Sequence, residues 1–297
     1  GPDPIWVASE LVQLCRGHLD AVAEEHVAPR GRSIEEIAES CRRSLAEGHP
    51  IDAIPCGLKD LDRLSAGFVK AEQVVLAGAS SMGKTALAGT LALSAALNGY
   101  PSAYYTREMT EEQLFWRFVA QISRVDLETL LRGEPEVDEM QRIHAAIDQI
   151  RALPLDICDI SNPTYPSLKA DIYERAARRK PRLVVVDYLQ LLTGDPARRH
   201  ANRAGELGYI INGTKGIAMD LGCTMLMLSQ LSRAVASRDD KRPQLSDLRD
   251  SGEIEQAADQ VWFVHREEYY LDRRRPRDDQ VGLMADWEVE IGRASCR

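Results

Sequence analysis

A glycine-rich stretch at residues 78–85 has the residue types and the spacing of a phosphate-binding loop. It reads Gly-Ala-Ser-Ser-Met-Gly-Lys-Thr and satisfies the pattern G-x-x-x-x-G-K-[ST] at every required position. An apolar run precedes it and an Ala- and Leu-rich run follows it, as expected for a strand that leads through the loop into a helix. Backbone N–H groups of such a loop and the helix N-terminus bind phosphate oxygens. Lys84 is expected to reach the β- and γ-phosphates and Thr85 to bind Mg²⁺, so the sequence predicts a site for ATP and Mg²⁺.

Three polar residues follow other predicted strands and would complete this site. Asp187 ends a run of apolar residues, Glu108 comes just past a second strand, and Gln230 ends a third. In an open parallel sheet, ligands bind beyond the carboxyl ends of the strands, so these side chains are expected near the loop. Asp187 is predicted to hold Mg²⁺, Glu108 to orient or deprotonate the attacking water, and Gln230 to sense the γ-phosphate. Spacing alone leaves Glu108 and Gln230 equally open to plain roles as cap or loop residues.

The elements that must position these residues alternate along the chain from about residue 57. Continuously apolar runs are predicted as strands at 73–77, 102–106, 155–157, 183–186, 223–228 and 260–264. Runs with helical spacing are predicted as helices at 84–97, 111–122, 137–150, 168–179 and 206–219. Apolar strands separated by helices are typical of a parallel sheet that is covered on both faces. The predicted fold class is therefore α/β, with a central, mostly parallel sheet flanked by helices.

The first part of the chain reads differently and is predicted as a helical segment, residues 1–50, ahead of a domain at 51–297. Apolar residues recur at helical spacing over 5–22, and a second helix opens at Ser33, where Glu36 completes a capping box. Two short helices cannot bury their apolar stripes alone. They are expected to dock on their own domain or on a neighbouring subunit, and the pattern leaves both open.

Composition excludes several classes of protein. The chain is 44% hydrophobic and 28% charged, which is ordinary for a globular protein. No apolar run is long enough to span a membrane, and the first residues lack the pattern of a signal peptide. The six cysteines form no C-x-x-C motif, so reduced thiols and a cytoplasmic location are predicted, without a transition-metal site. The net charge of -9 argues against nonspecific coating of nucleic acid, but not against a local loop that grips one strand.

Motifs spread over residues 57–266 resemble the DnaB family of replicative DNA helicases. The most specific block runs from SQLSR at 229–233 to SDLRDSGEIEQ at 246–256, and DYLQL at 187–191 follows the same family's pattern. The resemblance implies a RecA-like P-loop core and a hexameric ring that moves along single-stranded DNA by hydrolysing ATP. It also implies a homo-hexamer as the assembly, and a loader and a primase as further partners.

The resemblance also implies roles for individual residues. Lys84, Glu108 and Gln230 would serve catalysis, and Thr85 and Asp187 would bind the metal. Contacts with the DNA backbone would come from Arg249, Asp250 and Gly252. The residues implied to hold the nucleotide are Gly78, Ser81, Met82, Gly83, Lys84, Thr85 and Ala86.

The chain departs from the family's pattern at three places. Thr106-Arg107 stands where the family has Ser-Leu, and Ala257-Ala258-Asp259 stands where it has Asp-Ala-Asp. The family's last core strand carries a Lys-x-Arg pair that reaches the neighbouring subunit's γ-phosphate. Here Arg293 is the candidate for such a trans finger, and Ser295 falls where the arginine would be. An arginine supplied in trans is worth about 10³–10⁵ in rate, so this departure predicts ATP binding with slow hydrolysis.

Two other functions remain open at this point. One is another RecA-like ATPase, a recombinase or a clock-type regulator, against which the block at 229–256 argues. The other is a nucleotide-dependent, ring-forming module without catalysis. The intact Lys84, Asp187 and Glu108 argue against the second function, and the unusual C-terminal residues favour it.

Overall fold

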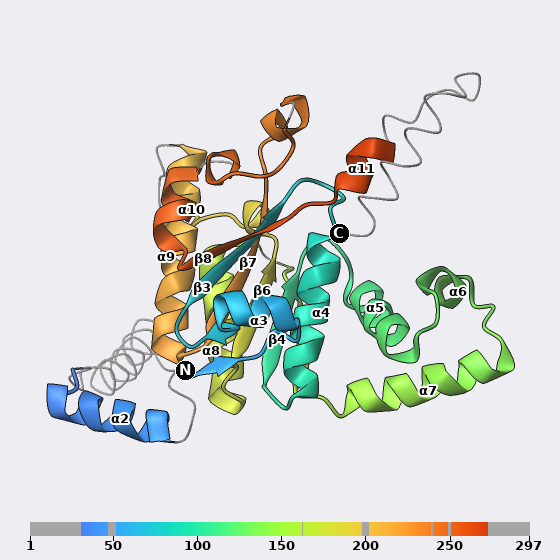
Figure 1. The fold of residues 1–297 in the computed structure, drawn as a ribbon, viewed down its shortest axis with the longest axis horizontal. Coiled ribbons are helices and arrows are strands. Elements are labelled where there is room, and N and C mark those ends of the chain that lie inside the picture. Colours follow the sequence, from blue (N-terminus) through green and yellow to red (C-terminus); the bar gives the residue numbers. More distant parts are fainter. Residues whose placement is uncertain are drawn as a thin grey trace, which may run out of the picture. The chain divides into compact units, whose positions relative to one another are not determined.

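The computed structural model describes residues 31–46, 52–161, 163–197, 202–238, 240–248 and 251–272 (Figure 1). Contacts within the chain define two compact units, Gly1–Ile51 and Asp52–Arg297. The first unit contains helix α2 (Ile34–Ala46), and the helix predicted over 5–22 lies outside the described residues. The Ser33 hydroxyl accepts from the Glu36 N–H at 3.2 Å, and the Glu36 carboxylate accepts from the Ser33 N–H at 2.7 Å. The predicted capping box is thus confirmed.

The second unit is built on a six-stranded parallel sheet with the order β5-β4-β6-β7-β3-β8. Its strands are β3 (Gln73–Gly78), β4 (Ser102–Thr106), β5 (Leu155–Asp159), β6 (Leu183–Asp187), β7 (Thr224–Gln230) and β8 (Gln260–Val264). All six were predicted from their apolar runs. The four central strands, β4, β6, β7 and β3, are almost completely buried, as expected when helices cover both faces.

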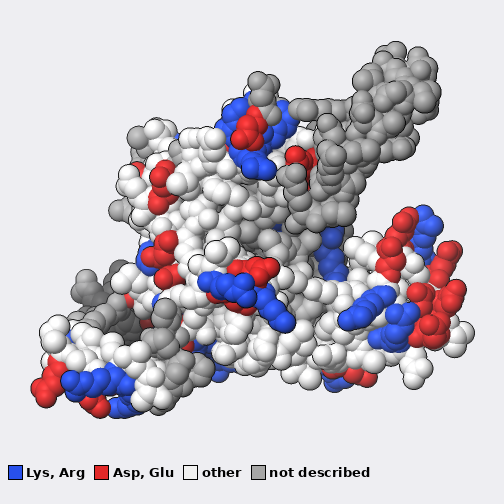
Figure 2. Space-filling view, in the orientation of Figure 1, with Lys and Arg blue, Asp and Glu red and all other residues white. Residues whose placement is uncertain are grey.

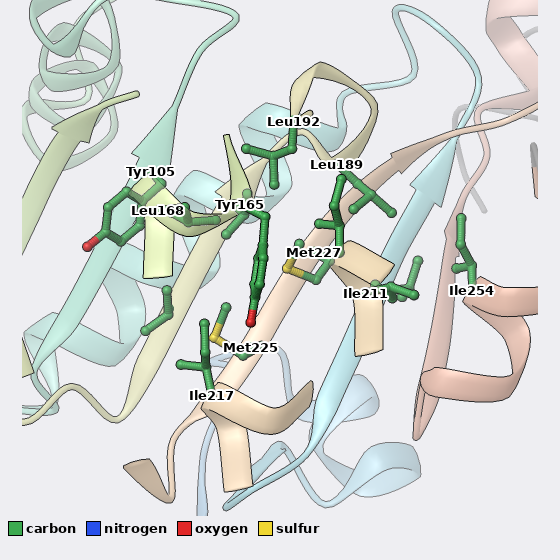
Figure 3. Packing of buried hydrophobic residues seen from close by; sticks show 14 of the residues in the cluster. Tyr105, Tyr165, Leu168, Leu189, Leu192, Ile211, Ile217, Met225, Met227 and Ile254 are labelled. Atoms are coloured by element: carbon green, nitrogen blue, oxygen red, sulfur yellow. The ribbon is translucent and has the colours of Figure 1, made fainter. Parts of the chain in front are cut away.

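Helices cover the sheet on both faces and enclose two hydrophobic cores. One face is packed against α8 (Tyr165–Arg178), α9 (Arg203–Leu221) and α10 (Ser251–Ala257), and Figure 3 shows part of this core. The other face is packed against α4 (Lys84–Leu97), α5 (Glu111–Ser123), α6 (Leu127–Arg132) and α7 (Val137–Arg151). Neighbouring residues of one strand point to opposite faces, so Tyr104 belongs to the second core and Tyr105 to the first. The α/β fold class is confirmed.

Several short elements were not predicted. They are the hairpin of β1 (Ala53–Ile54) and β2 (Phe68–Val69), the helices α3 (Lys59–Ser65) and α11 (Glu267–Asp272), and the 3₁₀ turns η1 (Leu189–Leu191), η2 (Arg233–Ser237) and η3 (Leu245–Asp247). Two predicted helices also begin earlier than expected. Thr164 caps α8 and Asn202 caps α9, each by accepting from a backbone N–H three residues on. These capping residues precede the apolar pattern, which made the predicted starts at 168 and 206 too late.

A buried amide ties the sheet to the helices on one face. The Gln73 side chain, with no exposed surface, donates to the carbonyls of Ile211 at 3.1 Å and Ala257 at 3.3 Å. It also accepts from the Thr214 hydroxyl at 2.7 Å. These bonds satisfy the whole amide and join β3 to α9 and α10.

Replacing Gln73 by Leu is expected to lower the free energy of unfolding by about 3 kcal/mol, because buried carbonyls lose their donor. Urea denaturation measures the change. Gln149→Leu on the exposed surface of α7 is the matched control and should leave the unfolding free energy near that of the wild type. Equal stability of the two variants would contradict the structural role of Gln73.

Candidate functional site

The loop between β3 and α4 has the backbone conformation that its glycines allow. Gly83, at the N-cap of α4, has φ 93°, in the left-handed region where glycine is favoured. A Cβ on Gly78 would lie 3.1 Å from the carbonyl oxygen of Val264 and 3.2 Å from Cγ of Lys84, so a larger residue would force neighbours apart. The loop is therefore compact, and it delivers the chain directly into the N-terminus of α4.

The Lys84 ammonium is held at the base of this loop. It donates to the carbonyl oxygens of Gly78 at 2.9 Å and Ala79 at 3.0 Å. An ammonium has three donors, so one proton remains for an anion above the loop. Burial lowers the pKa of Lys84, while the nearby carboxylates of Glu108 and Asp187 oppose that shift.

The sheet register brings the predicted residues from separate strands together. Thr106 at the end of β4 pairs with Asp187, and Gly78 at the end of β3 pairs with Gln230. A cavity of about 570 Å³ opens beyond these strand ends. It is lined by Ser80, Ser81, Gly83, Lys84, Thr85, Ala86, Glu108, Met109, Arg117, Tyr188 and Gln230. Glu108 and Gln230, which spacing alone left open, thus lie beside the loop, and the cap of α5 is Thr110 instead.

Asp187 lies beneath the cavity with 1% of its surface exposed. Burial raises the pKa of its carboxyl group, and the nearby hydroxyls of Thr85 and Tyr104 oppose that shift. Its Oδ1 is buried without a hydrogen-bond partner among the described residues. A buried carboxylate oxygen of this kind calls for a cation or a water molecule. Together with the Thr85 hydroxyl it forms a hard oxygen donor set, which fits Mg²⁺.

Other predicted residues lie elsewhere. Gly78 ends β3 and the Met82 side chain is buried, so neither lines the cavity, although both shape the loop. Gly252 lies in the first turn of α10, where a Cβ would meet nothing within 4 Å. Arg249, Asp250 and Arg293 are outside the described residues.

Sequence reasoning missed Arg117, which lines the cavity from α5. It sits in mid-helix, and only the packing of α5 beside α4 brings its guanidinium to the loop. No motif at strand ends signals such a residue.

Gln190 was also missed, although it stands in a motif that was noted. Its side-chain oxygen accepts from the Gln230 N–H at 3.1 Å, and its amide nitrogen donates to the Ser229 hydroxyl at 2.9 Å. The Gln190 carbonyl accepts in turn from Arg203 at 3.0 Å. The backbone of Gln230 is thereby fixed to η1 and to the first turn of α9.

A basic loop lies between η2 and η3, where Lys and Arg side chains gather in the view of Figure 2. The Arg238 guanidinium binds both carboxylate oxygens of Asp247 at 2.9 Å, and the Asp247 side chain is only 8% exposed. A bidentate pair of this kind fixes the planes of both groups. The loop therefore presents Lys241 and Arg242 from a closed, internally bonded turn.

Within the part of the chain that the structure describes, no group of three or more His, Cys, Asp or Glu side chains is placed to hold a metal ion. Among the same residues, four cysteines are free thiols, and burial raises the pKa of Cys56, Cys158 and Cys223 to about 12. No described helix has the length and apolar character needed to cross a bilayer.

Comparison with known proteins was made against families, curated sequences and solved structures. The family model of the DnaB-like helicase C-terminal domain matches residues 53–294. The replicative DNA helicase DnaB of Rickettsia conorii is 36% identical over 273 residues, which cover 86% of this chain and 54% of that protein. The replicative DNA helicase DnaB of Geobacillus stearothermophilus is 34% identical over 226 residues, covering 74% and 48%. The chain thus spans about half the length of the curated relatives it matches.

Two solved structures have the same fold. One is an isolated ATPase domain, which superimposes with a TM-score of 0.74 and 29% identity, covering 81% of this chain and 86% of that chain. A DnaB-like replicative helicase, described together with its interactions with primase, gives a TM-score of 0.71 and 26% identity, covering 90% and 66%. The central sheet described above is therefore that of a RecA-like ATPase domain of this type.

Proposed function

The chain belongs to the family of DnaB-like helicase C-terminal domains, and from this premise we propose that it is the ATP-hydrolysing motor of a replicative DNA helicase. One observation carries the proposal. A single cavity is lined by Lys84 and Thr85 from the loop and by Glu108 and Gln230 from two other strand ends, with Asp187 beneath it. This is the set of groups that phosphoryl transfer to water requires.

Each group has a role that follows from its chemistry. Lys84 and the loop N–H groups bind the phosphate tail of ATP, and Arg117 adds a second cation to the cavity wall. Thr85 and Asp187 would hold Mg²⁺, which supplies charge neutralisation on the phosphate oxygens when it is bound. Glu108 orients the attacking water and takes its proton. Gln230 hydrogen-bonds the terminal phosphate and is lost as a partner after hydrolysis.

The proposed substrate track is single-stranded DNA held by its backbone. Arg249, Asp250 and Gly252 are proposed to contact the strand. Gly252 is the described member of this set, and its lack of a side chain leaves the backbone accessible. Binding through few charges fits a chain whose net charge is -9. A homo-hexamer, a loader and a primase remain proposed partners, as does Arg293 as the trans finger.

Helix α2 is proposed to dock on a neighbouring subunit of the ring. It buries none of its residues, and Ile34 is 81% and Leu45 65% exposed. Exposed apolar side chains along one stripe of a helix favour a partner surface. The domain boundary after residue 50 is proposed on the same basis.

Steady-state ATPase measurements with and without single-stranded DNA test the proposal, together with strand separation and native mass with an ATP analogue. Stimulation by DNA and a hexameric mass are expected. ATP binding without turnover would instead favour the ring-forming module without catalysis. Turnover without strand separation would favour another RecA-like ATPase, such as a recombinase or a regulator.

Gln190→Ala is expected to lower kcat about tenfold with KM unchanged, because the hydrogen bonds that fix Gln230 are worth about 1.4 kcal/mol. The substituted residue does not line the cavity, so ATP binding should persist. Steady-state kinetics measure both constants, and Gln149→Ala is the control for loss of an exposed glutamine. A wild-type kcat in Gln190→Ala would show that Gln230 needs no such support.

A further inference from the structure

The two oxygens of the Asp187 carboxylate have different surroundings. Oδ2 accepts a hydrogen bond from the Tyr104 hydroxyl at 2.9 Å. Oδ1 is buried and has no hydrogen-bond partner in the described part of the chain. The carboxylate as a whole is 1% exposed, so solvent cannot compensate for this asymmetry. One oxygen is thus fixed by the protein, and the other remains available to a ligand.

The strand register explains why Tyr104 reaches this carboxylate. Strands β4 and β6 are parallel neighbours, and Tyr104 pairs with Val185, two residues before Asp187. Residues two apart on a strand share one face, so Val185, Asp187 and Tyr104 all point to the α4 side of the sheet. The Tyr104 ring has no exposed surface and is the bulkiest of the fully buried side chains described. Packing therefore holds the ring, and its only polar atom meets Oδ2.

We infer that Tyr104 is a positioning residue for the magnesium ligand, which fixes Oδ2 of Asp187 and so directs Oδ1 to the metal. The inference rests on the proposed function, since it assumes that the cavity binds nucleotide with a divalent cation. The terminal torsion of an aspartate is broad, so a carboxylate without this bond would rotate. The hydrogen bond also favours the charged form of a carboxylate that burial disfavours. Both effects weaken the metal site when the hydroxyl is removed.

The next residue along the strand provides a matched control. The Tyr105 hydroxyl donates to Asp171 at 2.6 Å on the opposite face of the sheet, within the core shown in Figure 3. Asp171 belongs to α8 and also binds Arg175 at 2.7 Å, away from the cavity. Tyr104→Phe and Tyr105→Phe each remove one buried hydroxyl that donates to a carboxylate. Only the first change touches Asp187.

The test measures Mn²⁺ binding in the presence of ADP, by the electron paramagnetic resonance signal of free Mn²⁺, and not turnover. Tyr104→Phe is expected to weaken Mn²⁺ binding about tenfold, the scale found for partners of metal ligands. Binding of a fluorescent nucleotide in EDTA should stay at the wild-type level. Tyr105→Phe should leave both affinities unchanged. Mn²⁺ binding by Tyr104→Phe that equals or exceeds that of Tyr105→Phe would overturn the inference.

A double-mutant cycle separates positioning from a general effect on the fold. In the background of Asp187→Asn, adding Tyr104→Phe should change Mn²⁺ affinity no further, since the hydroxyl acts through the lost carboxylate. An additional loss of the same size would show that Tyr104 acts through packing, and would overturn the inference. If the wild type itself binds no Mn²⁺ with ADP, both the proposed function and the inference fail. Normal wild-type binding with no effect of Tyr104→Phe removes the inference alone.

Discussion

Lys84→Ala is expected to abolish tight ATP binding and to lower kcat/KM for ATP by about 10³-fold, the scale found when a group that stabilises developing charge is removed. The side chain lines the cavity, and its ammonium has one donor not used by the loop carbonyls. Removing it takes away the cation closest to the base of the loop. Fluorescence titration with an ATP analogue and steady-state ATPase kinetics measure the two losses.

The size of this effect follows from the charges around the site. The Glu108 and Asp187 carboxylates both act on Lys84 strongly enough to oppose the lowering of its pKa by burial. Without the ammonium, these two carboxylates would face a triphosphate with Arg117 as the remaining lining cation from the described residues. Repulsion in a partly buried cavity is screened less than at the surface. The variant thus loses an attraction and gains an opposing charge.

Lys59→Ala is the control for this experiment, because Lys59 lies exposed at the start of α3 and does not line the cavity. Its ATP binding and turnover should equal those of the wild type. Thermal unfolding of Lys84→Ala should also stay close to that of the wild type, since the substitution removes donors from two carbonyls at the accessible loop. Wild-type ATP affinity in Lys84→Ala would contradict the assignment of the cavity as the nucleotide site.

The central fold could be predicted because strands buried on both faces are marked by continuous apolar runs. Such runs end where the strands end, and parallel strands place their carboxyl ends at one edge of the sheet. The polar residues Glu108, Asp187 and Gln230 could therefore be assigned to one site before the loop geometry was known. The phosphate-binding loop needed only its own spacing, since its function is carried by local backbone.

The residues that were missed act through tertiary contacts. Arg117 reaches the cavity from mid-helix, Gln190 acts on the backbone of another strand, and Tyr104 reads as one more apolar strand residue. Their roles depend on which elements become neighbours and in which register, and no short sequence pattern encodes that. The short hairpin β1–β2 was missed for a related reason, because strands of two residues show no periodicity.

The turn that carries Glu108 is fixed from both sides. The buried Thr106 hydroxyl donates to the Met109 carbonyl at 3.0 Å and accepts from the Met109 N–H at 3.4 Å, closing a loop around Glu108. The Arg107 N–H donates to the Asp187 carbonyl at 3.1 Å. Thr106 stands where the family has Ser, and the closing bonds use the hydroxyl that both residues share. The departure at this position therefore leaves the placement of Glu108 intact.

Glu108→Gln is expected to lower kcat for ATP about 10³-fold while ATP binding is kept, because an amide has the same shape but cannot take the proton of the attacking water. Loss of a carboxylate beside the phosphate tail should leave the affinity equal or higher. Glu112→Gln, an exposed change on α5, is the control and should retain wild-type turnover. Near-normal kcat in Glu108→Gln would reject Glu108 as the base. Compared with Lys84→Ala, which loses binding, this variant separates a motor from a module that only binds nucleotide, since a binding module would respond to the first change and not to the second.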